Sequence, residues 1–404
     1  MKRIVITGVG VVSALGNNMR DFSTAIQLGR SAIGPLTVVP TEKLSIKIAA
    51  QLQCFTPTAH FEERQLKLLD RATQYALVAA REAIADSGIE FSEVLSARTA
   101  VVLGSGIGGA TSSDESYRRL YGDGEQRLHP LTVPKVMFNA AASHISIEHR
   151  ITGPSFMVAS ACSSTNSAIG AVMQMLRSGL VDAAITGGTD ATLVYAGLKG
   201  WEALRVTASD TCRPFSKGRL GMVLGEGAGI FVLETLDHAR ARGAVIHAEL
   251  IGFGMSSDAS DIVAPAISGA VNAMTSCLRD AGLNASDVDY INAHGTGTVA
   301  NDVTETAAIH RAFGDHARTL MVSSTKAMHG HALGAAGALE LVATIAGMKH
   351  GFVPPTANYV AADPLCDLDC VPNETRAIAI AVALSNSFAF GGQNAVIAVR
   401  HDVQ

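Results

Sequence analysis

The sequence has 404 residues, of which 48% are hydrophobic and 17% are charged, and its formal net charge is −5. This length and apolar content predict a globular protein with a large core, and the acidic balance argues against nucleic acid as the main partner. No window approaches about 18 uninterrupted apolar residues, so no membrane span is predicted.

The chain begins with a predicted strand and turn rather than a secretion signal, because a β-branched run at residues 4–6 precedes Thr7-Gly8. We therefore expect the six cysteines to be reduced thiols and the protein to be cytoplasmic. Strands follow the β-branched and apolar runs of the first half, at residues 3–9, 99–103, 155–160, 182–186 and 229–233, with helices at 70–87 and 163–177 between them. Residues 110–135 are the least regular long stretch, and we expect them to leave the sheet at an interface.

A similar series starts again at about residue 246. Its strands are predicted at 248–254, 289–293, 320–324, 377–384 and 395–399, and its helices at 268–281 and 333–348. The alternation predicts an α/β fold with a mostly parallel sheet, and the repeat predicts two duplicated halves, residues 1–245 and 246–404. The helices at 163–177 and 333–348 are apolar or small on nearly every face, which suits burial between sheets.

Cys162 lies between a predicted strand and a helix, in the run VASACSSTNSAIG at residues 158–170. A thiol at a helix N-terminus feels the positive end of the helix dipole, which favours the thiolate. Cys162 is therefore a candidate nucleophile, although a small buried hydrophobic residue explains the position equally well.

Three glycine-containing loops that follow predicted strands hold candidate partners for this thiol: NAHGTGT at 292–298, STKAMHGHALGAAG at 324–337 and NSFAFGGQN at 386–394. Strand carboxyl ends are where α/β proteins usually place their sites. The pair His329 and His331 has no carboxylate or cysteine at ligand spacing, so we predict no metal site there.

Together with RIVITGVGVVSALG at the start and RPFSKGRLGMVLGEGAG at 213–229, these motifs make the chain resemble the elongating β-ketoacyl-ACP synthases almost end to end. The resemblance implies a thiolase-like fold, with two pseudo-duplicated halves forming a five-layered α-β-α-β-α core. It also implies a decarboxylative Claisen condensation of malonyl-ACP with an acyl chain held on a cysteine, in fatty acid, polyketide or aryl-polyene biosynthesis.

The resemblance assigns a role to each residue of the implied site. Cys162 would be acylated, with its own backbone N–H and that of Phe390 forming the oxyanion hole. His294 and His331 would stabilise the malonyl enolate as neutral donors, with their acid and base division open. The supporting and substrate-contacting residues would be Lys326 paired with Glu340 or else Glu305, the pantetheine-binding Thr296 and Thr298, and the acyl-pocket residues Ile107, Met222, Phe388 and Thr132.

No cofactor is implied beyond the phosphopantetheine of acyl carrier protein. Some relatives hold a structural monovalent cation at the positions of Asn292, Glu340, Ser385 and Asn386. The carrier protein is acidic, so its docking face should be basic, and Arg64, Lys67 and Arg127 match basic family positions. A solvated helix face explains these three residues equally well.

Departures from the family pattern concentrate around the acyl pocket, where Thr132 and Met222 stand at positions that are commonly aromatic. We therefore expect a specialised ketosynthase, working as a homodimer or with a chain-length-factor homologue. A degradative thiolase needs a second cysteine near the last loop, which residues 388–392 lack. A non-condensing chain-length factor typically lacks the nucleophile, so Cys162 argues against that alternative.

Overall fold

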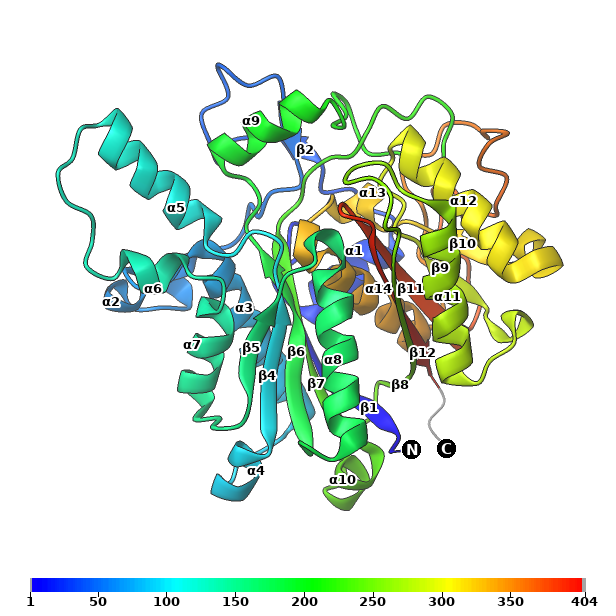
Figure 1. Cartoon of the computed structure of the whole chain (residues 1–404), viewed down its shortest axis with the longest axis horizontal. Helices are drawn as coiled ribbons and strands as arrows, with labels where there is room; N and C mark the ends of the chain where they lie inside the picture. Colours follow the sequence, from blue (N-terminus) through cyan, green and yellow to red (C-terminus); the bar gives the residue numbers. More distant parts are fainter. Residues whose placement is uncertain (1, 402–404) are drawn as a thin grey trace.

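The computed structural model describes residues 2–401 (Figure 1), and its strands are β1 (Ile4–Ser13), β2 (Gly34–Pro35), β3 (Ile48–Ala49), β4 (Thr99–Gly104), β5 (Ser155–Val158), β6 (Ala183–Asp190), β7 (Gly227–Thr235), β8 (Ala248–Ser257), β9 (Tyr290–Asn292), β10 (Met321–Ser323), β11 (Val382–Ala389) and β12 (Gln393–Arg400). The α-helices are α1 (Met19–Gln27), α2 (Glu63–Leu66), α3 (Arg71–Ser87), α4 (Glu93–Ala97), α5 (Ala110–Tyr117), α6 (Thr132–Val136), α7 (Ala140–His149), α8 (Ser164–Ser178), α9 (Tyr195–Leu204), α10 (Leu236–Ala241), α11 (Ile267–Ala281), α12 (Val299–Phe313), α13 (Lys326–His329) and α14 (Ala336–His350). Within the described residues, no helix combines the length and apolar character needed to cross a membrane.

All of the described strands except β2 and β3 form one ten-stranded sheet in the order β10-β9-β11-β12-β8-β1-β7-β6-β4-β5. The order β5-β4-β6-β7-β1 in the first half recurs as β10-β9-β11-β12-β8 in the second, and the two sets join where β1 pairs with β8. We propose residues 1–245 and 246–404 as the two structural units, since β8 begins at Ala248. Because one sheet runs through both, we do not expect either unit to fold alone.

The prediction of a mostly parallel sheet is wrong. Only the pairs β4–β5, β4–β6, β9–β10 and β9–β11 are parallel, and the other five neighbouring pairs are antiparallel. The connection from β11 to β12 spans only residues 390–392, and so short a turn joins antiparallel strands. In each half the last two strands and the first strand therefore pair antiparallel at the centre of the sheet.

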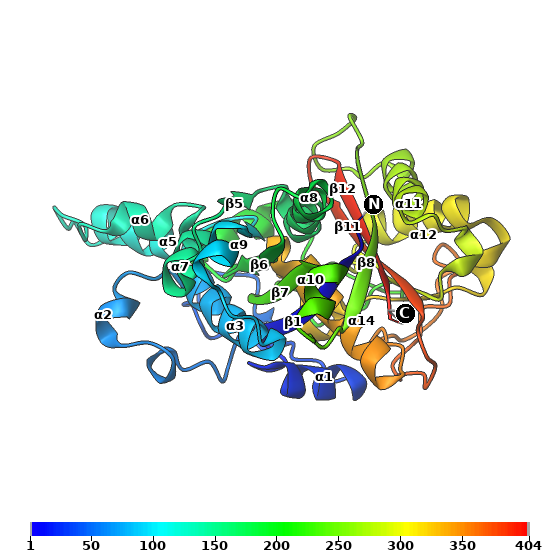
Figure 2. The same ribbon diagram turned by 90° about the horizontal axis from the view of Figure 1, so that it is seen from below.

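The layers follow from the polarity of the helices. The helix α14 is buried from Ala336 to Met348, and it packs with α8 between the two sets of strands. The helix α11 has only one buried face, whereas α3 is buried from Ala72 to Ala80 and partly exposed after it; α3 covers the outer side of the first half and α11 that of the second (Figure 2). This arrangement confirms the predicted five-layered thiolase-like fold.

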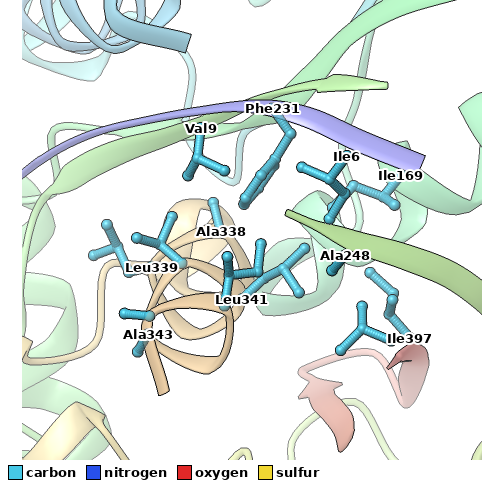
Figure 3. Packing of buried hydrophobic residues seen from close by; sticks show 14 of the residues in the cluster. Ile6, Val9, Ile169, Phe231, Ala248, Ala338, Leu339, Leu341, Ala343 and Ile397 are labelled. Atoms are coloured by element: carbon cyan, nitrogen blue, oxygen red, sulfur yellow. The ribbon is translucent and has the colours of Figure 1, made fainter. Parts of the chain in front are cut away.

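The core at the centre of the molecule consists of aliphatic side chains from α14 packed on β1 and β7 (Figure 3). Phe231 of β7 is fully buried in this cluster, and burying a side chain of this size contributes about 1.5–3 kcal/mol. The outer helix also approaches the sheet closely: a Cβ on Gly10 would lie 2.0 Å from the carbonyl oxygen of Ala79 in α3. Only glycine therefore fits at this position of β1.

Two predicted segments are different in the structure. Residues 110–135 were expected to be the least regular stretch, but they hold α5, a π-helical turn at Arg118–Gly122 and most of α6, which together project from the sheet (Figure 1). The last hairpin also starts later than the predicted strand at 377–384, because β11 runs from Val382 through the polar run 385–387. The apolar pattern could not show that polar residues would continue a buried strand.

The turns that precede the two central helices match in position and conformation. A 3₁₀ turn at Ala161–Ser163 leads into α8, and another at Leu333–Ala335 leads into α14. The first residue of each has a positive φ, +48° at Ala161 and +49° at Leu333, a region that costs energy for residues other than glycine. This turn fixes Cys162 at the start of α8.

Candidate active site

Cys162 lines a pocket that is partly open to solvent. The side chains around it come from both halves of the chain and meet where the central helices begin. They include every residue predicted for catalysis and substrate binding except Lys326, Ile107 and Thr132, and the pocket is lined by Cys162, Trp201, Val206, Met222, Asp258, Val263, Pro265, His294, Thr296, Thr298, Ala300, Asn301, His331, Phe388, Ala389, Phe390 and Asn394. The fold thus assembles one site from turns that are far apart in the sequence.

The pKa of the Cys162 thiol is raised, contrary to the expectation from the helix N-terminus. Burial raises its pKa to about 11, although the charge of Lys326 and a hydrogen bond from the backbone N–H of Phe390 act in the opposite direction. The residue is only 7% exposed, so the loss of hydration outweighs the helix dipole. The same hydrogen bond places the Phe390 N–H beside the sulfur, where an oxyanion donor is required.

We expect the alkylation of Cys162 by iodoacetamide to rise about 100-fold between pH 7 and pH 9, since the thiolate fraction grows tenfold per unit below the pKa. Peptide mass spectrometry separates this reaction from labelling of the exposed Cys54. A rate that is already constant at pH 7 would contradict the raised pKa of the Cys162 thiol.

His294 follows β9, and its backbone is fixed by a buried carboxylate. Glu305 of α12 accepts the backbone N–H of His294 at 2.8 Å and that of Gly295 at 2.7 Å. The Nδ1 atom of His294 lies 3.4 Å from Nζ of Lys326, which has only donors to offer. The ring is therefore the tautomer that carries its hydrogen on Nε2.

His331 presents the same tautomer by a different contact. The backbone N–H of Leu333 donates to Nδ1 of His331 at 3.2 Å, which again leaves the hydrogen on Nε2. Burial and the nearby Lys326 charge hold the pKa of both histidines well below the usual value. The ring centroids of His294 and His331 are 5.5 Å apart and nearly perpendicular, so two neutral N–H donors face one pocket.

Lys326 lies beneath the histidines rather than in the pocket. Its Nζ donates to the carbonyl oxygen of His294 at 2.6 Å and forms a fully buried ion pair with Glu340 of α14. Of the two predicted partners, Glu340 makes this contact, whereas Glu305 holds the His294 backbone. Burial raises the pKa of Glu340 to about 7, while the Lys326 charge opposes the rise.

Replacing Lys326 by methionine should lower the free energy of unfolding by about 3–5 kcal/mol at pH 8, because the buried Glu340 carboxylate loses its partner. The raised pKa sets the pH dependence: the loss should shrink toward pH 5, where a protonated Glu340 needs no cation. Urea unfolding at both pH values measures the effect. The double variant Lys326→Met with Glu340→Gln is the control and should recover part of the loss, and an equal loss at both pH values would contradict the pairing.

The thiol and one nitrogen from each histidine lie within 4.8 Å of one another, close enough for a metal ion. Their surroundings favour hydrogen bonding instead, because a zinc-bound histidine ordinarily donates its other N–H to an oxygen, and both Nδ1 atoms here face donors. His329 does not join this group, since its nitrogens contact the carbonyl oxygen of Gly330 and Oγ1 of Thr325.

The two threonines predicted to bind pantetheine lie at the rim of the pocket. Their hydroxyl oxygens are 2.9 Å apart, and Thr298 also caps α12 by accepting the N–H of Asn301. On another side of the pocket, Asn386 of β11 donates to Glu305 at 3.2 Å. Its Oδ1 atom, together with Oε2 of Glu340 and Oγ of Ser385, is buried without a hydrogen-bond partner.

The remaining predicted residues lie away from the pocket. Ile107 packs with Met222 in a neighbouring apolar cluster, whereas Thr132 lines a separate polar hollow beside Lys67. Arg64 lies on α2 and pairs with Glu62 at 2.7 Å. Lys67 directly follows α2 and pairs with Glu63 at 3.2 Å. Arg127 is exposed in the loop before α6.

Sequence reasoning did not single out Trp201 and Asp258, which also line the pocket. Trp201 is the only tryptophan in the chain, and this was the one feature of the sequence that could have drawn attention to it. Asp258 accepts a hydrogen bond from Asn394 at 2.7 Å, a contact between β12 and the residue that follows β8, which no local motif indicates.

The chain is similar to known proteins over nearly its whole length. The family models described as beta-ketoacyl synthase N-terminal domain and C-terminal domain match residues 1–239 and 247–360. The chain is 48% identical to Nodulation protein E of Rhizobium meliloti (strain 1021), over 99% of both chains, and 41% identical to 3-oxoacyl-[acyl-carrier-protein] synthase 2 of Staphylococcus aureus (strain COL), over 98% of this chain and 97% of the relative. The structure of the ishigamide ketosynthase/chain length factor superposes with a TM-score of 0.95 at 36% identity and covers 100% of both chains.

Proposed function

This chain belongs to the beta-ketoacyl synthase family, and from that premise we propose that Cys162, His294 and His331 carry out its two half-reactions in one pocket. The protein is a β-ketoacyl-ACP synthase, an acyl-transferring condensing enzyme of fatty acid or polyketide biosynthesis. The observation that carries the residue assignment is that the Cys162 sulfur and one nitrogen from each histidine lie within 4.8 Å of one another.

In the first half-reaction, the Cys162 sulfur attacks the thioester carbonyl of acyl-ACP. The tetrahedral oxyanion accepts hydrogen bonds from the backbone N–H groups of Cys162 and Phe390. The C–S bond to the carrier then breaks, and the proton lost by the Cys162 thiol ends on the departing pantetheine thiol. Because the thiol is neutral at rest, its deprotonation accompanies the attack rather than preceding it.

In the second half-reaction, malonyl-ACP loses CO₂ and the electron pair moves onto the thioester as an enolate. The Nε2–H groups of His294 and His331 donate to the enolate oxygen, which needs them neutral and protonated on that atom. The enolate carbon attacks the acyl thioester on Cys162, the C–S bond to the sulfur breaks, and the Cys162 thiolate takes up a proton from solvent. Lys326 positions the ring of His294 through the carbonyl and Nδ1 contacts.

We propose that a structural monovalent cation binds at Asn292, Glu340, Ser385 and Asn386. Oε2 of Glu340, Oγ of Ser385 and Oδ1 of Asn386 all lack a hydrogen-bond partner, and oxygen atoms are the ligands such ions prefer. We place no catalytic step on the ion. Its proposed role is to hold β11 against α14 behind the histidines.

Incubation with acyl-ACP tests the assignment of the nucleophile. The acyl mass should appear on the peptide that contains Cys162, and malonyl-ACP should then remove it as a β-ketoacyl product. An unmodified Cys162 with every acyl-ACP offered would overturn the proposal and favour a non-condensing scaffold subunit.

The carrier protein and the second subunit are proposed to bind on the side of α2, α5 and α6. Arg64, Lys67 and Arg127 supply positive charge there, although two of the three already pair with glutamates. Exposed aromatic and aliphatic side chains occur on or close after α5 and α6, at Tyr117, Tyr121, Val133 and Phe138, and on the edge strand β5 at Phe156. We propose that this apolar face forms a dimer, with an identical chain or a chain-length-factor homologue, and that Thr132 reaches the partner's acyl pocket. We place this enzyme in the cytoplasm with its carrier protein.

The pathway is proposed to be a specialised one, since the relatives include Nodulation protein E as well as a 3-oxoacyl-ACP synthase. Met222 leaves the pocket wall with a flexible side chain where the family commonly has an aromatic one. An acyl-ACP panel of different lengths, with and without any co-encoded homologue, tests this. Activity confined to the common saturated chains, unaffected by a homologue, would contradict it.

A further inference from the structure

Trp201 stands on the wall of the active-site pocket, opposite the catalytic turns. It lies in α9, and the ring packs against an apolar cluster that includes Leu198 and Met222. The neighbouring Glu202 fastens the helix by accepting the backbone N–H of Ile46 at 3.1 Å. The indole is therefore held on a well-anchored element.

The aromatic neighbour of Trp201 is Phe390, whose ring centroid lies 6.0 Å away at an interplanar angle of 31°. Phe390 precedes two glycines with positive φ, +83° at Gly391 and +67° at Gly392. Glycines in this region leave the backbone free to adopt other conformations. The direction of the Phe390 N–H therefore depends on what holds the phenyl ring.

We propose that Trp201 is a positioning residue: its ring holds Phe390 so that the Phe390 backbone N–H points at the acylated sulfur of Cys162. The inference rests on the proposed role of that N–H as an oxyanion donor. Trp201 touches no reacting atom. It fixes the donor through a ring contact from a separate element, α9.

The magnitude follows from the strength of aromatic pairs. Such a pair is worth a factor of roughly 2 to 13, less than the 10²–10³ lost with a whole oxyanion donor. Trp201→Leu should therefore slow the acylation of Cys162 by about tenfold, while Trp201→Phe, which keeps a ring, should stay within about threefold of the wild-type rate.

Alkylation by iodoacetamide separates this role from a structural one, because that reaction forms no tetrahedral oxyanion. Trp201→Leu should alkylate Cys162 at least as fast as the wild type while acylating it more slowly from hexanoyl-pantetheine. Leu204→Ala is the matched control, since Leu204 lies on the same helix and is 45% exposed. It should leave both rates unchanged.

The single tryptophan gives a second readout without mutation. Acylation of wild-type Cys162 should change the Trp201 emission excited at 295 nm, and Cys162→Ala should show no change with the same thioester. The inference would be overturned if Trp201→Leu were acylated as fast as the wild type, or if its alkylation rate fell as much as its acylation rate. Trp201 emission that does not change on acylation of the wild type would also overturn it. Wild-type protein that is never acylated would instead count against the proposed function.

Discussion

Cys162→Ala should abolish acyl transfer and condensation, with a loss of at least about 10⁴-fold, because Cys162 supplies the only thiol among the described residues that line the pocket. The two histidines keep their hydrogen bonds in this variant, since none of those bonds involves the sulfur. Decarboxylation of malonyl-ACP should therefore continue within about tenfold of the wild-type rate. Release of ¹⁴CO₂ from labelled malonyl-ACP measures this, and mass spectrometry measures the missing acyl adduct.

The matched control for that experiment is Cys212→Ala. Cys212 is also buried, but its sulfur contacts the carbonyl oxygen of Thr296 rather than the pocket. This variant should retain the acyl adduct on Cys162. If Cys162→Ala still formed an acyl-enzyme, or if it lost decarboxylation completely, the separation of the two half-reactions would be wrong.

His331→Ala should lower malonyl-ACP decarboxylation by about 10²–10³-fold, the usual cost of removing one preorganised donor from a developing oxyanion. Acylation of Cys162 should change much less, since its oxyanion donors are backbone groups. The two rates are measured separately, by CO₂ release and by the acyl adduct. His294→Ala should show the same division, because both rings present Nε2–H.

A third histidine provides the comparison. His329 is as buried as His331 and lies two residues away, but its nitrogens bond to Thr325 and Gly330. His329→Gln should therefore leave decarboxylation within about tenfold of wild type. A loss as large as that of His331→Ala would show that the effect comes from disturbing the turn and not from a missing donor.

The candidate site was largely predictable because its chemistry sits in short glycine-containing loops after strands. Cys162, His294 and His331 were each visible in this way, and the fold brings them together. The protonation of Cys162 was not predictable, since it depends on how deeply the turn is buried. Trp201 and Asp258 were missed because their roles arise from contacts between segments that carry no motif.

The apolar pattern predicted the helices and strands that are apolar along their whole length, as in α14. It failed for β11, where Ser385 and its neighbours continue a strand that the pattern ends too early. Asn166 of α8 donates its side-chain N–H groups to the backbone carbonyl oxygens of Ser385 and Ala395. This contact between the polar run and a helix of the other half depends on the tertiary fold, so the local pattern could not indicate it.

The matching turns before α8 and α14 have a consequence for the origin of the single nucleophile. Gly334 occupies in the second turn the place that Cys162 occupies in the first, counted from the residue with positive φ. A Cβ at Gly334 would lie 2.3 Å from the backbone nitrogen of Gly106 and 2.7 Å from a carboxylate oxygen of Asp190. If one ancestral unit was copied, the two copies have diverged at this position. The first turn has space for a reactive side chain, whereas in the second turn the backbone of Gly106 and the carboxylate of Asp190 occupy that space.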